Sequence, residues 1–420
     1  MRFAQTLGAL ILVGGLAVVL ALLLGWLWAT PELDQRLFFG IWRTRAFLAL
    51  CALLALAVVA ALAAFDRRRA FRAVAVCVGA VAVLAVLEIP AALGLIDYSR
   101  AFQGGEGGAG AKAVPHLEVR GEAPQDLAHA WHYPLPWLPF EFKADRRGYR
   151  NAPDREDADV YLLGDSILVA GLVPWEQTLT HRIEAASGLR TMNIALIGVG
   201  AERQLRMLLD ARVPLADRLV LHFVFEGNDL GDLKVERQDG APERPGLAQR
   251  SLLANLLAWL QRKSDPCRLA MERRTGDLAG RQVLFHWTDI SFRGLEEEIP
   301  AFLEACARIR AAVHERGGRH AVVYVPAKIR VLGPLCTWPA ESSLRGHEAH
   351  LNPLRERLLA DARARGVPVL DLSEPLAEAA RAGRTPYFLA DTHLDPVGHE
   401  VAAQAILAWP EFQRLTRRVR

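Results

Sequence analysis

Three long apolar runs near the start of the chain constrain its fold more than any other feature of the sequence. They cover about residues 7–29, 46–65 and 73–96, and the third is interrupted by Glu88 and Pro90. A run of about 20 apolar residues is long enough to cross the hydrocarbon core of a bilayer as a helix. The first run also exceeds the roughly 7–15 apolar residues of a signal peptide. We therefore predict a membrane region with three transmembrane helices within residues 1–99.

Charges between these runs predict how the helices are oriented. The loop at residues 66–72 contains four arginines and one aspartate. Short loops rich in arginine and lysine remain in the cytoplasm. We therefore expect a cytoplasmic N-terminus and expect everything after about Asp97 to lie on the other side of the membrane. The glycine-rich stretch that follows predicts a flexible linker over residues 100–128, ahead of a folded domain over residues 129–420.

The composition excludes several classes of protein. Fifty Lys and Arg residues against 47 Asp and Glu leave a formal charge of +3, too balanced for a protein that binds nucleic acid through charge. The five cysteines have no paired short spacings, which excludes a zinc ribbon and a small disulfide scaffold. The sequence also contains no dinucleotide fingerprint, phosphate loop or metal-ligand cluster. We therefore expect no cofactor, no metal and no nucleic-acid partner.

Beyond the linker, short apolar runs alternate with longer segments of helical periodicity. Runs of this kind are typical of buried strands. Their alternation with helices predicts an α/β fold, with a doubly wound parallel sheet and helices on both faces. The predicted strands are 160–163, 192–195, 219–225, 320–325 and 367–372, and the predicted helices are 175–187, 201–212, 297–316, 354–365 and 396–408.

Polar residues at the ends of the predicted strands are the candidates for a site. In a doubly wound sheet, ligands bind at the carboxyl ends of the strands. Taken singly, these residues also have simpler explanations, because serine often caps a helix and asparagine and aspartate often form turns. In chain order, the segments are Gly164-Asp165-Ser166, a loop ending in Gly198, Asn228-Asp229 and Asp391-Thr392-His393.

Taken together and in this order, the four segments resemble the SGNH (GDSL-type) hydrolase superfamily over about residues 159–409. Its marks are a Ser in a Gly-Asp-Ser turn, a Gly after the second strand, an Asn in a later turn and a late Asp–His pair. The resemblance implies a flavodoxin-like three-layer fold and an ester hydrolase. Two positions depart from it: Gly171 lies one residue beyond the usual spacing, and Glu226 stands where the superfamily usually has glycine. We expect these departures to affect the substrate rather than the chemistry.

Acyl transfer itself needs residues of these types. It requires a nucleophile, a base, a carboxylate that orients the base, and hydrogen-bond donors for the oxyanion. Ser166 on its tight turn would be the nucleophile, His393 the base and Asp391 the orienting carboxylate. The oxyanion donors would be the main-chain N–H groups of Ser166 and Gly198 and the side-chain amide of Asn228. Glycine at position 198 would let the backbone approach the substrate closely.

Three further polar residues have less specific predicted roles. Lys328 follows the fourth predicted strand and is a candidate substrate-binding residue, with an ordinary solvated lysine as the alternative. His399 lies inside the last predicted helix, where we expect it to pack rather than act as a second base. Glu88 lies near the outer end of the third apolar run, and we expect an interfacial anchor there rather than a functional intramembrane acid.

The resemblance implies an enzyme that acts on O-acyl esters, most often O-acetyl esters, of a cell-surface or exported glycan. More loosely, the Asp-x-His spacing and the membrane region resemble alginate-type O-acetyltransferase domains. Together with the three apolar runs and the arginine-rich loop, that likeness implies a multi-pass protein of the bacterial cytoplasmic membrane with a periplasmic catalytic domain. An acyl group on Ser166 would pass to water in an esterase, or to a sugar hydroxyl in an acetyltransferase served by a membrane acyl-donor protein.

Two alternatives stay open from the sequence. One is a lipid or thioester hydrolase at the surface of the bilayer, which the membrane region would favour. The other is a catalytically idle glycan-binding scaffold of an export complex, which the intact set of polar residues at the strand ends disfavours.

Overall fold

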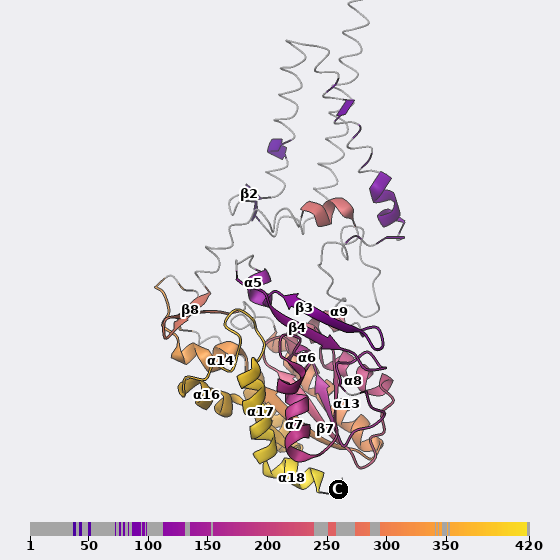
Figure 1. The fold of residues 1–420 in the computed structure, drawn as a ribbon, viewed down its shortest axis with the longest axis vertical. Coiled ribbons are helices and arrows are strands. Elements are labelled where there is room, and N and C mark those ends of the chain that lie inside the picture. Colours follow the sequence, from indigo (N-terminus) through magenta and orange to yellow (C-terminus); the bar gives the residue numbers. More distant parts are fainter. Residues whose placement is uncertain are drawn as a thin grey trace, which may run out of the picture. The chain divides into compact units, whose positions relative to one another are not determined.

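The computed structural model describes most of the chain beyond residue 111 (Figure 1). The chain forms two compact units: Met1–Glu106 with Ala241–Cys267, and Gly107–Gly240 with Arg268–Arg420. It therefore passes from one unit to the other three times. The described residues are 112–130, 135–152, 154–238, 251–257, 274–285, 295–340 and 353–417, with short pieces between 37 and 98 and between 342 and 351.

The predicted transmembrane helices fall largely outside the described residues. This applies to all of 7–29, to nearly all of 46–65 and to much of 73–96. Within the part of the chain that is described, no helix combines the length and the apolarity needed to cross a bilayer. The three spans therefore stay a prediction.

Within the first unit, Glu88 contacts a segment that lies far away in the sequence. Its Oε1 atom accepts hydrogen bonds from Ser251 Oγ at 3.1 Å and from the main-chain N–H of Leu253 at 2.6 Å. Residues 252–257 are helical, so Glu88 caps the start of this helical stretch. The segment that interrupts the second unit is thereby fixed to the third apolar run.

A five-stranded parallel sheet forms the centre of the second unit, as the sequence predicts. Its strands lie in the order β11-β10-β7-β5-β6, and every neighbouring pair is parallel. Numbered along the chain, this is the flavodoxin-like order, with its topological switch point between β5 and β7. The strands are β5 Val160–Gly164, β6 Thr191–Ala195, β7 Leu219–Phe225, β10 Arg319–Val325 and β11 Val369–Asp371.

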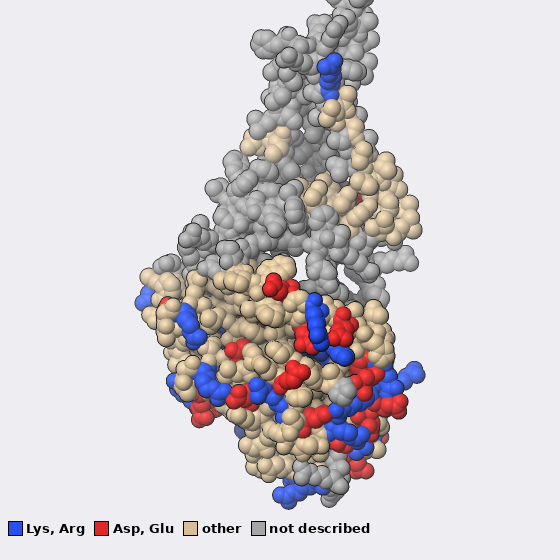
Figure 2. Space-filling model, viewed as in Figure 1, with Lys and Arg blue, Asp and Glu red and all other residues tan. Residues whose placement is uncertain are grey.

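Helices cover both faces of the sheet and make three layers. Along β7, Leu221 and Phe223 pack into one apolar cluster, whereas Val220 and Val224 pack into two others on the opposite face. The face of this unit seen in Figure 2 carries interspersed positive and negative side chains. One face is covered by α6 Ser166–Val169, α7 Leu179–Ser187, α14 Lys328–Leu332, α16 Ser373–Arg381, α17 Pro396–Ala408 and α18 Pro410–Thr416, and the other by α8 Ala201–Asp210, α9 Asp229–Gln238, α13 Ile299–Glu315 and α15 Leu354–Ala364.

Two of the predicted helices begin later than the periodicity suggests. The helix predicted over 175–187 is a 3₁₀ turn, Trp175–Gln177, followed by α7. Thr178 separates them because its side chain caps α7 by accepting from the N–H of His181. The helix predicted over 297–316 likewise starts as a 3₁₀ turn, Glu296–Glu298, and becomes α13 at Ile299.

Residues 118–128 are not the flexible linker that the sequence predicts. Strand β3, Glu118–Ala123, pairs antiparallel with β4, Leu138–Lys143, and α5, Asp126–Ala130, lies between them in the chain. Apart from the half-buried Ala123, β3 is exposed along its length, so it shows no apolar pattern that would predict a strand. Strand β3 is held in place by its hydrogen bonds to β4. Leu127 of α5 packs into a small apolar cluster with Leu284.

Candidate active site

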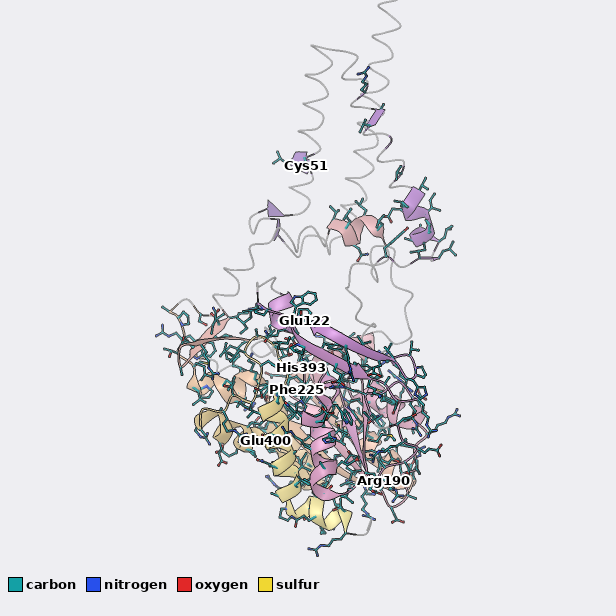
Figure 3. All side chains as sticks on the ribbon, in the orientation of Figure 1. Cys51, Glu122, Arg190, Phe225, His393 and Glu400 are labelled. Atoms are coloured by element: carbon teal, nitrogen blue, oxygen red, sulfur yellow. The ribbon has the colours of Figure 1, made fainter. Side chains whose placement is uncertain are left out.

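Ser166, His393 and Asp391 form a continuous hydrogen-bonded chain; His393 is labelled in Figure 3. The Nε2 atom of His393 lies 2.8 Å from Ser166 Oγ. Its Nδ1 atom lies 2.6 Å from Asp391 Oδ1. In this arrangement the hydroxyl can give its proton to Nε2 while Nδ1–H donates to the carboxylate, as in the triad of serine hydrolases. The structure thus brings together the three residues that the sequence predicts as catalytic.

The Ser166 end of this hydrogen-bonded chain lies on the turn between β5 and α6. Gly164 ends the strand, and a Cβ atom there would lie 3.1 Å from Leu168 Cδ1 and from Phe223 Cβ, so a side chain would crowd the sheet. Asp165 caps α6 by accepting from the N–H of Ile167 at 3.1 Å. Ser166 is therefore the first residue of a short helix at the carboxyl end of the sheet.

Arg150 holds the far end of the same helix. Its guanidinium donates to the carbonyl oxygens of Val169 at 2.9 Å, of Val173 at 2.8 Å and of Ala170. The side chain is buried, and burial lowers the pKa of Arg150 to about 10. A buried cation therefore fixes the carbonyl end of the helix that begins with Ser166.

The charges of Asp391 and His393 stabilise one another. Burial alone would raise the pKa of Asp391, but the charge and the hydrogen bond of His393 bring it below its usual value. Burial alone would lower the pKa of His393, but the charge and the hydrogen bond of Asp391 raise it. Asp391 Oδ1 also accepts from the main-chain N–H of His393 at 2.9 Å, which fixes the carboxylate beside the ring.

Two of the three predicted oxyanion residues, Gly198 and Asn228, lie in the loops after β6 and β7. Gly198 has a φ of +64°, in the left-handed region that favours glycine. Asn228 donates from Nδ2 to Asp232 Oδ2 at 2.9 Å, and its amide also hydrogen-bonds to Asp165, whose pKa is raised by burial. Asn228 therefore lies beside the nucleophile turn, at the switch point of the sheet. The donor roles of Gly198 and Asn228 stay predictions.

Lys328 has a different place from the predicted one. It is 1% exposed, and its Nζ atom donates to the carbonyl oxygens of Leu284 at 2.7 Å, Leu389 at 2.8 Å and Asp391 at 3.1 Å. An ammonium group has three protons to donate, and these three acceptors use them all. The prediction that Lys328 binds substrate is therefore wrong, because the side chain points inward and holds the loop of the triad acid.

Glu226 occupies the position where the superfamily usually has glycine. It is buried, and both of its carboxylate oxygens contact the guanidinium of Arg330, with Arg330 Nε at 2.8 Å and 3.0 Å. It also accepts from the N–H of Ala327 at 2.9 Å. The carboxylate of Glu226 therefore links the end of β7 to α14, the helix that begins with Lys328.

Sequence reasoning missed Asp126 of α5. Its main-chain N–H donates to Asp391 Oδ2 at 2.7 Å. Among the described residues, Asp126, Asp391 and His393 are the one group whose ligand atoms lie close enough to hold a metal, all within 4.8 Å of one another. Hydrogen bonds within the group and to the main chain already occupy these atoms, which favours a role in the triad over metal binding. No motif marks Asp126, because its partners lie more than 260 positions away in the sequence.

Comparison with known families agrees with this geometry. Residues 283–413 match the family described as "SGNH hydrolase-like domain, acetyltransferase AlgX". This match makes the C-terminal part of the chain similar to the SGNH hydrolase superfamily. The matched range contains Asp391 and His393, whereas Ser166 precedes it.

A curated relative extends the likeness to alginate acetyltransferases. Probable alginate O-acetylase AlgJ of Pseudomonas putida is 32% identical over 143 residues, which cover 33% of this chain and 35% of that protein. The chain therefore spans about a third of that relative's length.

Solved structures of a lipase and an esterase are less similar in sequence. A GDSL-like lipase of Bacteroides thetaiotaomicron is 11% identical, with a TM-score of 0.32 over 61% of this chain and 86% of that one. An acetyl xylan esterase is 12% identical, with a TM-score of 0.33 over 59% of this chain and 98% of that one. TM-scores of this size add no weight to the family match.

Proposed function

We propose that this protein is a serine-dependent acyl-ester hydrolase or O-acetyltransferase that acts on O-acylated glycans outside the membrane. The observation that carries the proposal is the hydrogen-bonded chain from Ser166 Oγ through His393 to Asp391, with distances of 2.8 Å and 2.6 Å. The likeness to an alginate O-acetylase supports a polysaccharide ester as the substrate class.

In the first half of the proposed reaction, Ser166 Oγ attacks the ester carbonyl carbon while His393 Nε2 takes the hydroxyl proton. Asp391 stabilises the imidazolium that forms. The oxyanion is stabilised by the N–H groups of Ser166 and Gly198 and by the amide of Asn228. The tetrahedral intermediate then breaks its bond to the leaving alcohol, which takes the proton from His393, and an acyl-serine remains.

The second half of the reaction uses the same groups in the opposite direction. His393 Nε2 removes a proton from water or from a sugar hydroxyl, and the resulting oxygen nucleophile attacks the acyl-serine carbonyl. Collapse of this intermediate releases the acid or the acylated sugar and returns the proton to Ser166 Oγ. The identity of the acceptor alone separates an esterase from an acetyltransferase.

The membrane topology belongs to the same proposal. The arginine-rich loop at residues 66–72 supports a bacterial cytoplasmic-membrane protein whose catalytic unit lies in the periplasm. Alkaline phosphatase fused after Arg420 should be active, and a fluorescent protein fused at the same point should be dark. The reverse pattern would place the site in the cytoplasm and exclude an exported glycan as substrate.

The activity is tested by acetate release from a panel of acetylated polysaccharides, with and without a non-acetylated sugar acceptor. The detergent-solubilised full chain should release acetate, and mass spectrometry of the quenched enzyme should find one acetyl group on Ser166. Ser166→Ala should lose both signals, whereas Ser187→Ala at the end of α7 should keep them. Acetate release that survives in Ser166→Ala would overturn the serine mechanism, and turnover of lipid or thioester substrates alone would overturn the glycan assignment.

A further inference from the structure

Asp126 and the triad loop hold one another through reciprocal hydrogen bonds. The N–H of Asp126 donates to Asp391 Oδ2 at 2.7 Å. In return, the Asp126 carboxylate accepts from the N–H of Thr392 at 2.9 Å and from the Thr392 hydroxyl. Thr392 lies between the triad acid and the triad base, so Asp126 fixes both the acid side chain and the backbone that connects it to the base.

The carboxylate of Asp126 is also close to the imidazole. Its Oδ2 atom lies 3.7 Å from His393 Nδ1, too far for a hydrogen bond but close enough for a strong charge interaction. Nδ1 is the nitrogen that faces Asp391, so the ring has two carboxylates on the side opposite Ser166. Thirty-nine per cent of the Asp126 side chain is exposed, so its carboxyl group can exchange protons with solvent.

We propose that Asp126 is a positioning residue of the triad, a second carboxylate that orients the Asp391–His393 loop and stabilises the imidazolium form of His393. This inference rests on the proposed acyl-transfer function and extends it to a residue outside the family motifs. When His393 takes the proton of Ser166, the new positive charge faces Asp391 directly and Asp126 at 3.7 Å. The second carboxylate therefore favours proton transfer to Nε2 without touching the substrate.

The charged groups around the ring come from several elements. They are Asp391 on the same loop, Asp126 on α5, and Asp165 at the start of α6. Lys328 of α14 lies behind the loop, on the carbonyl of Asp391. Partial burial first, and the charge of Asp391 second, raise the pKa of Asp126 above its usual value.

A purely structural role for Asp126 is the competing explanation. Its Oδ1 atom accepts from the N–H of Leu127 at 2.5 Å, so the carboxylate also stabilises the start of α5. Such a role predicts lower stability without any change in the pKa of His393. The positioning role predicts a change in that pKa even where the fold is intact.

The test compares the pH dependence of kcat/KM for Asp126→Asn, Asp126→Glu and wild type, using 4-nitrophenyl acetate and the full chain. An asparagine oxygen can still accept from Thr392, but it carries no charge. Asp126→Asn should therefore move the acidic limb of kcat/KM to lower pH by about one unit and lower kcat by about tenfold. Asp126→Glu, which keeps the charge, should return the limb toward its wild-type position.

Two further measurements make the outcome decisive. Glu122→Gln removes an exposed charge from the neighbouring strand β3 and should leave the pH profile unchanged. The NMR titration of the His393 ring, followed through its Hε1 proton, should give a lower pKa in Asp126→Asn, even if turnover is too weak to measure. A wild-type ring pKa and pH limb in Asp126→Asn, with Ser166→Ala inactive, would overturn this inference alone. Full activity in Ser166→Ala would instead overturn the proposed function.

Discussion

The ammonium group of Lys328 donates a hydrogen bond to the main-chain carbonyl of Asp391 over 3.1 Å. A buried cation on α14 thus holds the residue that orients the imidazole of His393. The same group also bonds to the carbonyls of Leu389 and Leu284, the latter at the end of strand β9, Arg281–Leu284. The side chain of Lys328 therefore fixes the loop that contains Asp391 both to α14 and to the end of β9.

Replacing Lys328 should act on stability and turnover rather than on substrate binding. Lys328→Met leaves buried carbonyls without their donor, at a cost of about 1–3 kcal/mol for each group that water cannot reach. We expect a lower thermal midpoint and a lower kcat, with KM almost unchanged. Lys143→Met, at a half-exposed lysine of β4, is the matched control. A higher KM at unchanged stability would restore the role in substrate binding.

The triad variants should show strong non-additivity. Ser166→Ala and His393→Ala should each lower kcat by about 10⁶, and the double variant should lose little more, because the two residues act as one unit. Asp391→Asn should cost about 10⁴, because an amide favours the wrong tautomer of His393. His399, whose Nδ1 accepts from the N–H of Leu179, is the control, and His399→Ala should reduce stability only. Additive losses in the double variant would contradict a shared mechanism.

Asn228 is predicted to act on the transition state. Asn228→Ala should lower kcat by about 10²–10³ with KM little changed, if its amide donates to the oxyanion. Asn228→Asp keeps the size of the side chain but places a negative charge beside Asp165, and it should be at least as inactive. Circular dichroism would verify that both variants fold. Wild-type turnover in Asn228→Ala would limit this residue to a role in the turn.

Two buried histidines should make the fold sensitive to acid. His222 and His320 lie on β7 and β10 with ring centres 5.7 Å apart, and His222 Nε2 contacts Gln204 at 2.8 Å. Burial lowers the pKa of His222 to about 4 and that of His320 well below its usual value. Both rings are neutral in the folded chain at pH 7. Below about pH 6.5 the unfolded chain takes up protons that the folded chain does not, so stability falls with pH down to about pH 4.

Urea unfolding between pH 7 and pH 5 measures this effect. Each histidine should contribute a loss of up to about 1.4 kcal/mol per pH unit below pH 6.5. The double variant with His222→Leu and His320→Leu should show a flatter profile, and His181→Leu on α7 should keep the wild-type slope. An equally steep slope in the double variant would assign the acid sensitivity to other groups.

The central sheet was predictable because its strands are buried and therefore consist almost entirely of apolar residues. Val160–Gly164 and Leu219–Phe225 are buried along their whole length and are apolar apart from Gly164 and His222, so the sequence marks them without help from tertiary contacts. Strand β3 lacks this signal because most of it is exposed. Helix α9, Asp229–Gln238, was also missed. Most of its residues are charged or polar, so the two leucines that pack on the sheet, Leu230 and Leu233, give too weak an apolar pattern to predict a helix.

The hydrogen-bonded chain of Ser166, His393 and Asp391 was predictable for a different reason, because its residues lie in short motifs. The residues that support it were not. Arg150, Lys328 and Asp126 act through main-chain carbonyls and N–H groups far away in the sequence, and a backbone partner leaves no pattern in the side chains. The position of Lys328 at the end of a strand was visible, but the inward direction of its side chain depends on the fold of the segments around Leu284 and Leu389.

The three crossings between the units place Ser166 and His393 on opposite sides of the segment that interrupts the second unit. Proteolytic cuts near residues 106, 240 and 267 would divide the second unit into two polypeptides, one with Ser166 and the other with Asp391 and His393. Strands β7 and β10 would join them through seven paired residues, from Leu219–Arg319 to Phe225–Val325. The residues of the Ser166–His393–Asp391 chain thus come from two separate stretches of sequence that pair within the sheet through β7 and β10.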